Sequence, residues 1–250
     1  MSKFPLLLIC CLGSHFLPRT IVAQSEISPQ ELLHKVAQSF FGGQGLTSIN
    51  LSGSARRIAG ALDETGEMSL SASADGTSSL EMNLTSGKRT ESQGPFADGQ
   101  PCFWSGVNGI NHPASAHNCA IPFAWFIPEL GLFSPQRSPN GTFSTQPGDG
   151  SGRIALHSSS TPPAGLDPME AQIASNVATY DLQIDASSLL LVELQYRLHP
   201  DDNAGIDIPV RVAFSDYRAV NGVQVPFHIQ RFVNGVLSVD IVLSDAAVAR

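Results

Sequence analysis

AVNGVQVPFHIQRFVNG, residues 219–235, is the stretch that decides the fold of this chain. Asn-Gly occurs at 221–222 and again at 234–235, and apolar and polar residues alternate between the two pairs. An Asn-Gly pair between alternating segments predicts a type I′ hairpin turn, because that turn needs a positive φ at both central residues. Two such turns predict an antiparallel meander of three strands, with residues 223–233 as its middle strand.

Pro226 is the residue that does not fit a central strand, because proline has no N–H group to donate to a neighbouring strand. It falls between Gln224 and His228 on the polar face of the segment. The apolar face consists of Val223, Val225, Phe227 and Ile229. A sheet edge or a bulge tolerates proline, so the sheet is expected to be open and curved. We predict that the Pro226 nitrogen faces no carbonyl group of a neighbouring strand.

The same period of two covers much of the remaining chain. Segments with an apolar residue at every second position are 49–55, 67–76, 79–87, 179–188 and 189–199. Upstream, the opposite face carries Ser, Thr, Asn and Glu, so each strand has one face toward the core and one toward water. Only 14% of residues are charged, which also suits an all-β extracytoplasmic protein. The chain is therefore predicted to be mainly β with a few helices (α+β), in a single domain over residues 25–250.

Three segments break this period and predict helices. Residues 28–43 begin with an N-cap at Ser28, carry one apolar stripe and end at a Gly pair. Residues 167–177 repeat the cap signal. Between them, Pro122 is expected to start a short helix that Pro128 limits or kinks. Because a helix with one apolar face must bury it, we expect the first helix to lie on the sheet.

The first residues have the features of a secretory signal peptide. Lys3 precedes the apolar run 4–12, and small residues follow near 22–24, where cleavage is expected. The apolar run is too short to span a bilayer as a helix. Residues 1–24 are thus predicted to be removed, which leaves a periplasmic or secreted protein without a transmembrane span in the mature chain.

The charge of the chain argues against two classes of partner. The formal net charge is −8, and removal of Lys3 and Arg19 with the signal segment makes it −10. An acidic chain without large basic clusters is not expected to bind nucleic acid or to dock on anionic membranes. The short basic pairs 56–57 and 88–89 are interpreted as solvated strand or turn charges.

Cys102 and Cys119 are the cysteines of the predicted mature chain, and two cysteines in an exported protein most simply form one disulfide. It would close a loop of about 17 residues, for which the chain-entropy account gives roughly 3 kcal/mol of stabilisation. The spacing does not fit a redox Cys-x-x-Cys pair or a zinc site.

Residues 199–207 gather oxygen ligands that could bind calcium, but they lack EF-hand spacing, and a polar loop is preferred. Neither a metal nor a cofactor is expected. Asn83 and Asn140 match glycosylation acceptors.

The middle of the chain, residues 101–135, holds a dense aromatic cluster that includes both tryptophans. One hypothesis is that this cluster fills the core beneath the helices. The other is that it lines an apolar pocket for a lipid or an acyl chain, since a half-open sheet must fill its concave face with its own side chains or with a ligand. The pocket candidates are Phe103, Trp104, Phe123, Trp125 and Phe126.

Motifs that would identify an enzyme are missing from the sequence. Gly-x-Ser-x-Gly, His-Glu-x-x-His and the Walker A loop do not occur, so no catalytic residue is predicted. The Gly-rich stretch 148–153 does not lie between a strand and a helix of a βαβ unit. Scattered His and Asp residues leave a hydrolase open as an alternative, which would need a pocket with a close Ser–His or Asp–His pair.

The order of these elements resembles the LolA/LolB-like superfamily of periplasmic lipoprotein carriers. The segments that carry the resemblance are FSDYRAVNGVQVPFHIQRFVNG (214–235), GEMSLSASADGTSSLEMNL (66–84), KRTES (88–92) and FWSGVNG (103–109). The resemblance implies an incomplete antiparallel β-barrel that wraps helical lid segments around an apolar cavity. The chain also looks similar to secreted proteins that share the segment Asn-Gly-Val-x-Val-Pro-Phe-His-Ile. That similarity implies no activity.

The leading hypothesis is a non-enzymatic, exported envelope protein that binds an apolar ligand, a lipid or a lipoprotein acyl chain, in a half-barrel cavity. The first alternative is an envelope protein-interaction or sensor module whose core is filled. The second is a hydrolase without a recognisable motif. An empty or a filled interior would distinguish the first two.

Overall fold

The computed structural model describes residues 27–43, 45–98, 101–121, 123–133, 141–146, 151–162 and 164–250. The predicted signal segment 1–24 lies outside the described residues, as do Pro122 and the possible glycosylation acceptor Asn140. The prediction that residues 25–250 form one domain stays a prediction.

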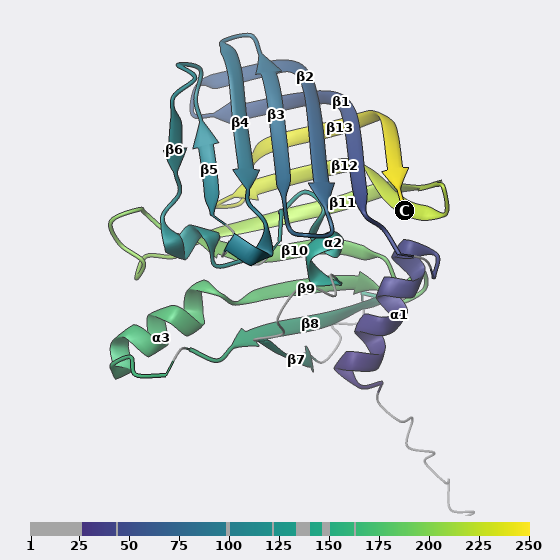
Figure 1. Ribbon diagram of the computed structural model, residues 1–250, viewed down its shortest axis with the longest axis vertical. Coiled ribbons are helices and arrows are strands. Elements are labelled where there is room, and N and C mark those ends of the chain that lie inside the picture. Colours follow the sequence, from purple (N-terminus) through teal and green to yellow (C-terminus); the bar gives the residue numbers. More distant parts are fainter. Residues whose placement is uncertain are drawn as a thin grey trace, which may run out of the picture.

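The described strands join in one 13-stranded antiparallel sheet (Figure 1). The N-terminal strands are β1 (Ser48–Ala59), β2 (Leu62–Ser73), β3 (Ser78–Leu84), β4 (Gly87–Gln93), β5 (Cys102–Ser105) and β6 (Asn111–Pro113). The C-terminal strands are β7 (Gly141–Gln146), β8 (Arg153–Ser160), β9 (Tyr180–Asp185), β10 (Leu191–Leu198), β11 (Ile208–Val220), β12 (Val223–Val233) and β13 (Val236–Ala249). Their order in the sheet is β6-β5-β4-β3-β2-β1-β13-β12-β11-β10-β9-β8-β7.

This strand order makes an open barrel. The first strand, β1, pairs with the last, β13, so the two halves of the chain meet in the middle of the sheet. Among the described strands, β6 and β7 pair on one side only and form the two edges. The predicted fold class, a mainly β protein with an incomplete antiparallel barrel, is confirmed.

The β11–β12–β13 meander forms as the Asn-Gly pairs predict. The φ angles are 48° at Asn221 and 79° at Gly222, and 50° at Asn234 and 76° at Gly235. A positive φ at both central residues is what a type I′ turn requires.

Pro226 has a strand neighbour on one side only. It lies opposite Tyr217 of β11, whereas the pairing of β12 with β13 begins two residues later, at His228. A continuous ladder on both sides of Pro226 would have contradicted the prediction for its nitrogen, and the pairing shows no such ladder. Pro226 itself is buried, so the face that it shares with Gln224 is not uniformly solvated.

The helices are α1 (Pro29–Phe41), α2 (Pro128–Leu132) and α3 (Pro168–Val177), with short 3-10 turns η1 (Phe96–Asp98) and η2 (Ala116–Cys119). The Ser28 hydroxyl accepts a hydrogen bond from the Glu31 N–H at the start of α1, and Asp167 and Glu170 form a capping box on α3. The prediction for the middle helix was wrong. Pro128 begins α2 instead of limiting a helix, because proline at the first helical position loses no intrahelical hydrogen bond.

The helices cover an apolar concave face. In Figure 1 the sheet curls around α2, with α1 and α3 at opposite sides of its lower part. The apolar stripe of α1, Leu32, Val36 and Phe40, is buried, and α1 packs against β12 and β7. Among the described residues, no helix is both long enough and apolar enough to cross a membrane.

Candidate ligand-binding site

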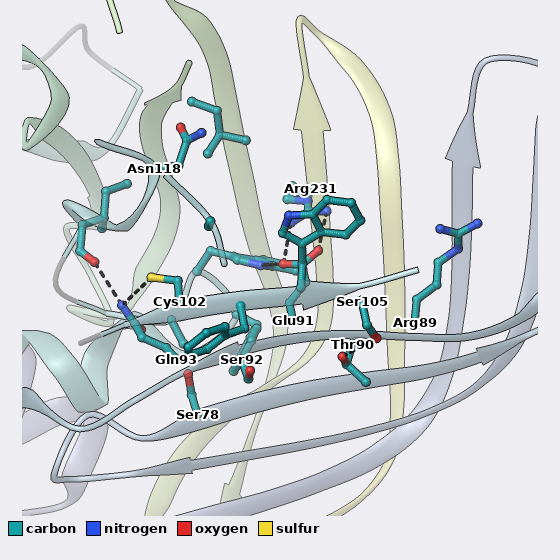
Figure 2. Close-up of a pocket in the computed structure, with 18 of the residues that line it drawn as sticks. Ser78, Arg89, Thr90, Glu91, Ser92, Gln93, Cys102, Ser105, Asn118 and Arg231 are labelled. Atoms are coloured by element: carbon teal, nitrogen blue, oxygen red, sulfur yellow. Dashed lines mark hydrogen bonds and ion pairs between the residues drawn. The ribbon is translucent and has the colours of Figure 1, made fainter. Parts of the chain in front are cut away.

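A partly open cavity of about 410 Å³ lies on the concave face, between β3–β5 and the segment that leads into α2. Strands β4 and β5 form one wall, and residues 114–126, where described, form the other. The end of β10 and Arg231 of β12 close a further side. Figure 2 shows the side chains that line this space. A volume of roughly 300–1,000 Å³ is typical of small-molecule sites.

All five predicted pocket residues line this cavity, but they differ in burial. Phe123 and Phe126 are only 4% and 2% exposed and belong to the core. Trp104 is 44% exposed and stacks on the His112 ring, with 4.5 Å between ring centroids. Phe103 and Trp125 are intermediate. The aromatic cluster is therefore partly a core plug and partly a cavity wall.

A disulfide links Cys102 of β5 to Cys119 of η2, as the cysteine count predicts, with 5.8 Å between the Cα atoms. The buried Gln93 of β4 lies beside Cys102 (Figure 2). Its side-chain amide donates to the Ile121 carbonyl at 3.3 Å. The two links hold the segment before α2 against β4 and β5, and so set the width of the cavity.

An ion pair lies on the floor of the cavity. The Arg231 guanidinium donates two hydrogen bonds of 3.0 Å to the Glu91 carboxylate, and the Trp125 indole N–H donates to the same group at 2.8 Å. Arg231 also stacks over the Trp125 ring, 4.4 Å from its centroid. Burial opposes the charge on Glu91, but the ion pair with Arg231 and the indole hydrogen bond outweigh it and lower the pKa of Glu91.

Two further arginines face the cavity, and the strand register explains why. Arg89 of β4 lies opposite Met82, a buried core residue, so it is on the inner face. Arg57 of β1 lies opposite Val239 of β13, which in turn lies opposite Arg231. Burial, followed by the positive charge of Arg89, lowers the pKa of Arg57, with a smaller contribution from Arg231. The three guanidinium groups thus act on one shared space.

The interpretation of the two basic pairs as solvated charges is half right. Arg56 and Lys88 are exposed and form surface ion pairs with Asp63 and Glu81. For Arg57 and Arg89 the interpretation was wrong, because adjacent residues of a strand point to opposite faces. Marking every second residue of segments 53–57 and 89–93 as inward would have placed Arg57 and Arg89 on the inner face of the sheet.

A second carboxylate, Glu129 of α2, lies deep in the core at 1% exposure. The Tyr217 hydroxyl is 3.4 Å from it and donates to the Leu191 carbonyl at 2.5 Å. Burial raises the pKa of Glu129 to about 7. No sequence pattern predicts this buried carboxylate, since nothing distinguishes Glu129 from an exposed glutamate of a helix.

The oxygen-rich segment 199–207 serves a structural purpose. The Asn118 side chain accepts from the His199 N–H and donates to the His199 carbonyl, both at 2.8 Å, which ties η2 to the loop after β10. Within the described part of the chain, no group of three or more His, Cys, Asp or Glu side chains is arranged to hold a metal ion.

A Ser–His–Asp series occurs on the outer face of the sheet. The His228 ring lies 2.7 Å from Asp240 and 3.3 Å from the Ser215 hydroxyl. Its strand neighbour Ile229 points into the core, so His228 points away from the cavity. The series therefore lies outside the cavity described above.

An open antiparallel half-barrel that curls around helices and keeps a cavity on its concave face defines the LolA-like class of folds. The particular structures that the chain resembles agree with this. A domain named as an outer membrane lipoprotein-sorting protein from Vibrio parahaemolyticus aligns with a TM-score of 0.54 and 11% identity, over 87% of this chain and 91% of that one. A LolA superfamily protein from Nitrosomonas europaea aligns at 0.52 and 10%, over 90% and 94%.

A DUF1329 family protein from Desulfovibrio piger is similar to the same degree, with a TM-score of 0.53 and 10% identity over 87% of this chain and 90% of that one. No protein-family model and no curated protein matches the sequence. The resemblance to LolA/LolB-like proteins is confirmed at the level of the fold.

Proposed function

We propose that this protein is an exported envelope protein, periplasmic or secreted, that binds a lipid or an acyl chain without catalysing a reaction on it. One observation carries the proposal. The half-barrel does not fill its concave face with its own side chains, but leaves about 410 Å³ beside an aromatic wall.

The chemistry of the wall supports an apolar ligand. Phe103, Trp104 and Trp125 offer ring surface that is not fully buried by the protein itself. Each CH₂ group that moves from water into such a site gains about 0.8 kcal/mol. The acyl chain of a lipid is long and narrow and consists mostly of CH₂ groups, so it fits this chemistry. The name of the Vibrio parahaemolyticus neighbour, a lipoprotein-sorting domain, agrees with this class of ligand.

Uptake of a fluorescent fatty-acid probe by purified, delipidated protein tests the proposal. We expect saturable binding, and we expect Trp125→Ala to weaken it about tenfold, the effect of losing one good aromatic contact. Phe232→Ala is the matched control, because Phe232 packs under Arg211 on the outer face. Its affinity should equal that of the unmodified protein.

Absence of uptake by protein with a native near-ultraviolet spectrum would contradict the proposal. Specific capture of an envelope partner by the same sample would then favour the protein-interaction or sensor module. Turnover of an ester probe, lost in a cavity variant, would favour the hydrolase.

A further inference from the structure

The cavity is unusual in having cations at positions where the strand pattern calls for apolar residues. Arg57, Arg89 and Arg231 come from β1, β4 and β12, and all three occupy inward register positions. The chain as a whole has 22 acidic and 14 basic residues, so a general excess of arginine does not explain the cluster.

The carboxylates nearby neutralise the charge of Arg231 but leave donors of the other two groups without an acceptor. Glu91 accepts two hydrogen bonds from Arg231, whereas Glu64 forms an ion pair with Arg57 at 3.7 Å, which is too far for a hydrogen bond. Among the described residues none forms an ion pair with Arg89. The buried Nη1 of Arg57 and the Nε atoms of Arg89 and Arg231 have no hydrogen-bond partner.

Unsatisfied buried N–H groups cost free energy unless something accepts from them. The guanidinium group presents a planar fork of donors that fits the two oxygens of a carboxylate or phosphate. Arg89 and Glu91 rise from the same face of β4 (Figure 2), so an anion beside Arg89 lies in the cavity that the aromatic residues line. A single ligand could then contact both surfaces.

We propose that the ligand of this cavity is an anionic amphiphile. Its carboxylate or phosphate head group binds Arg57 and Arg89, and its acyl chain lies along the aromatic wall of Phe103, Trp104 and Trp125. Arg231 stays paired with Glu91 and adds to the positive potential. This inference rests on the proposed function and names the chemical class of the ligand.

Four ligands with the same C16 chain test the inference by competition with the fluorescent probe: palmitate, hexadecyl phosphate, hexadecanol and hexadecyltrimethylammonium. We expect each anion to bind about tenfold tighter than the alcohol, the effect of one charge-assisted hydrogen bond, and the cation to bind worst. Palmitate and hexadecyl phosphate differ only in the head group. The one that binds more tightly shows whether the site prefers a carboxylate or a phosphate.

Arg89→Met keeps the length of the side chain and removes its charge. It should reduce the preference for the anions over the alcohol about tenfold, and Arg89→Lys should restore part of it. Lys88→Met is the matched control, since Lys88 neighbours Arg89 but pairs with Glu81 on the outer face. It should change nothing.

The two proposals fail differently. If the alcohol binds as tightly as the anions, or if Arg89→Met keeps the preference in full, the anionic head group is wrong and the lipid-binding function stands. If none of the four ligands competes, both are wrong. Thermal unfolding of each variant verifies that a loss of binding is not a loss of fold.

Discussion

The two ends of the concave face follow the same alternation and have different outcomes. Around α1 and the first half of β12 the inward side chains are aliphatic or aromatic, as at Val223, Val225 and Phe40, and they are buried. Around β4 the inward positions are Arg89, Glu91 and Gln93, and a cavity remains. The alternation of inward and outward positions therefore determines how the strands lie in the sheet. The residue types at the inward positions determine whether the interior is packed or leaves a cavity.

The largest effect should come from the packed end. Phe40→Ala removes a ring that is 1% exposed and is expected to cost about 3–5 kcal/mol in the free energy of unfolding. Phe103→Ala, at the cavity wall, should cost only about 1 kcal/mol, because less of its surface is buried on folding. Urea unfolding of both variants measures the difference. Equal losses would mean that the cavity end is packed as tightly as the α1 end.

The buried carboxylate Glu129 should make the stability of the protein depend on pH. The pKa of Glu129 is about 7 in the folded protein against an ordinary 4.5, because it is buried. The folded state then holds a proton that the unfolded state releases, so stability falls as the pH rises from about 4.5 to 7. Relative to Glu129→Gln, the unmodified protein should lose up to about 3 kcal/mol across this window. Parallel pH profiles of stability for the two proteins would contradict the assignment.

The ion pair of the cavity end should give a smaller effect. Arg231→Met leaves Glu91 without its cation and is expected to cost about 2 kcal/mol, less than a fully buried pair, because the Glu91 side chain is 32% exposed. Adding Glu91→Gln should recover part of this loss. A double-mutant cycle with urea unfolding measures the coupling, and strictly additive losses would show that the pair contributes no coupling.

The sequence predicted the parts of this molecule that depend on neighbours along the chain. Asn221-Gly222 and Asn234-Gly235 determine their hairpins locally, and Ser28 and Asp167 determine the starts of their helices. The start of α2 at Pro128 was missed, because proline is compatible with either a first turn or a break, and the packing around it decides between them.

The site was only half predictable for a related reason. The five aromatic residues stand out in composition, and all line the cavity. The Glu91–Arg231 pair spans 140 positions, and no local pattern joins two residues so far apart. Its existence depends on the β1–β13 pairing, which places the two halves of the sheet side by side. Arg57 and Arg89 were readable in the register of their strands, but only once the inner face was known.

The pairing of Ser48 with Ala249 has a consequence for how the chain reaches this structure. Until the last strand is in place, β1 and β12 each lack a neighbour, and the sheet remains two separate pieces with exposed hydrogen-bonding edges. Contacts between residues so distant in sequence close slowly, because loop closure costs entropy before any contact forms. We therefore expect native structure to form only after β13 has been synthesised, and the incomplete chain to need protection from aggregation until then.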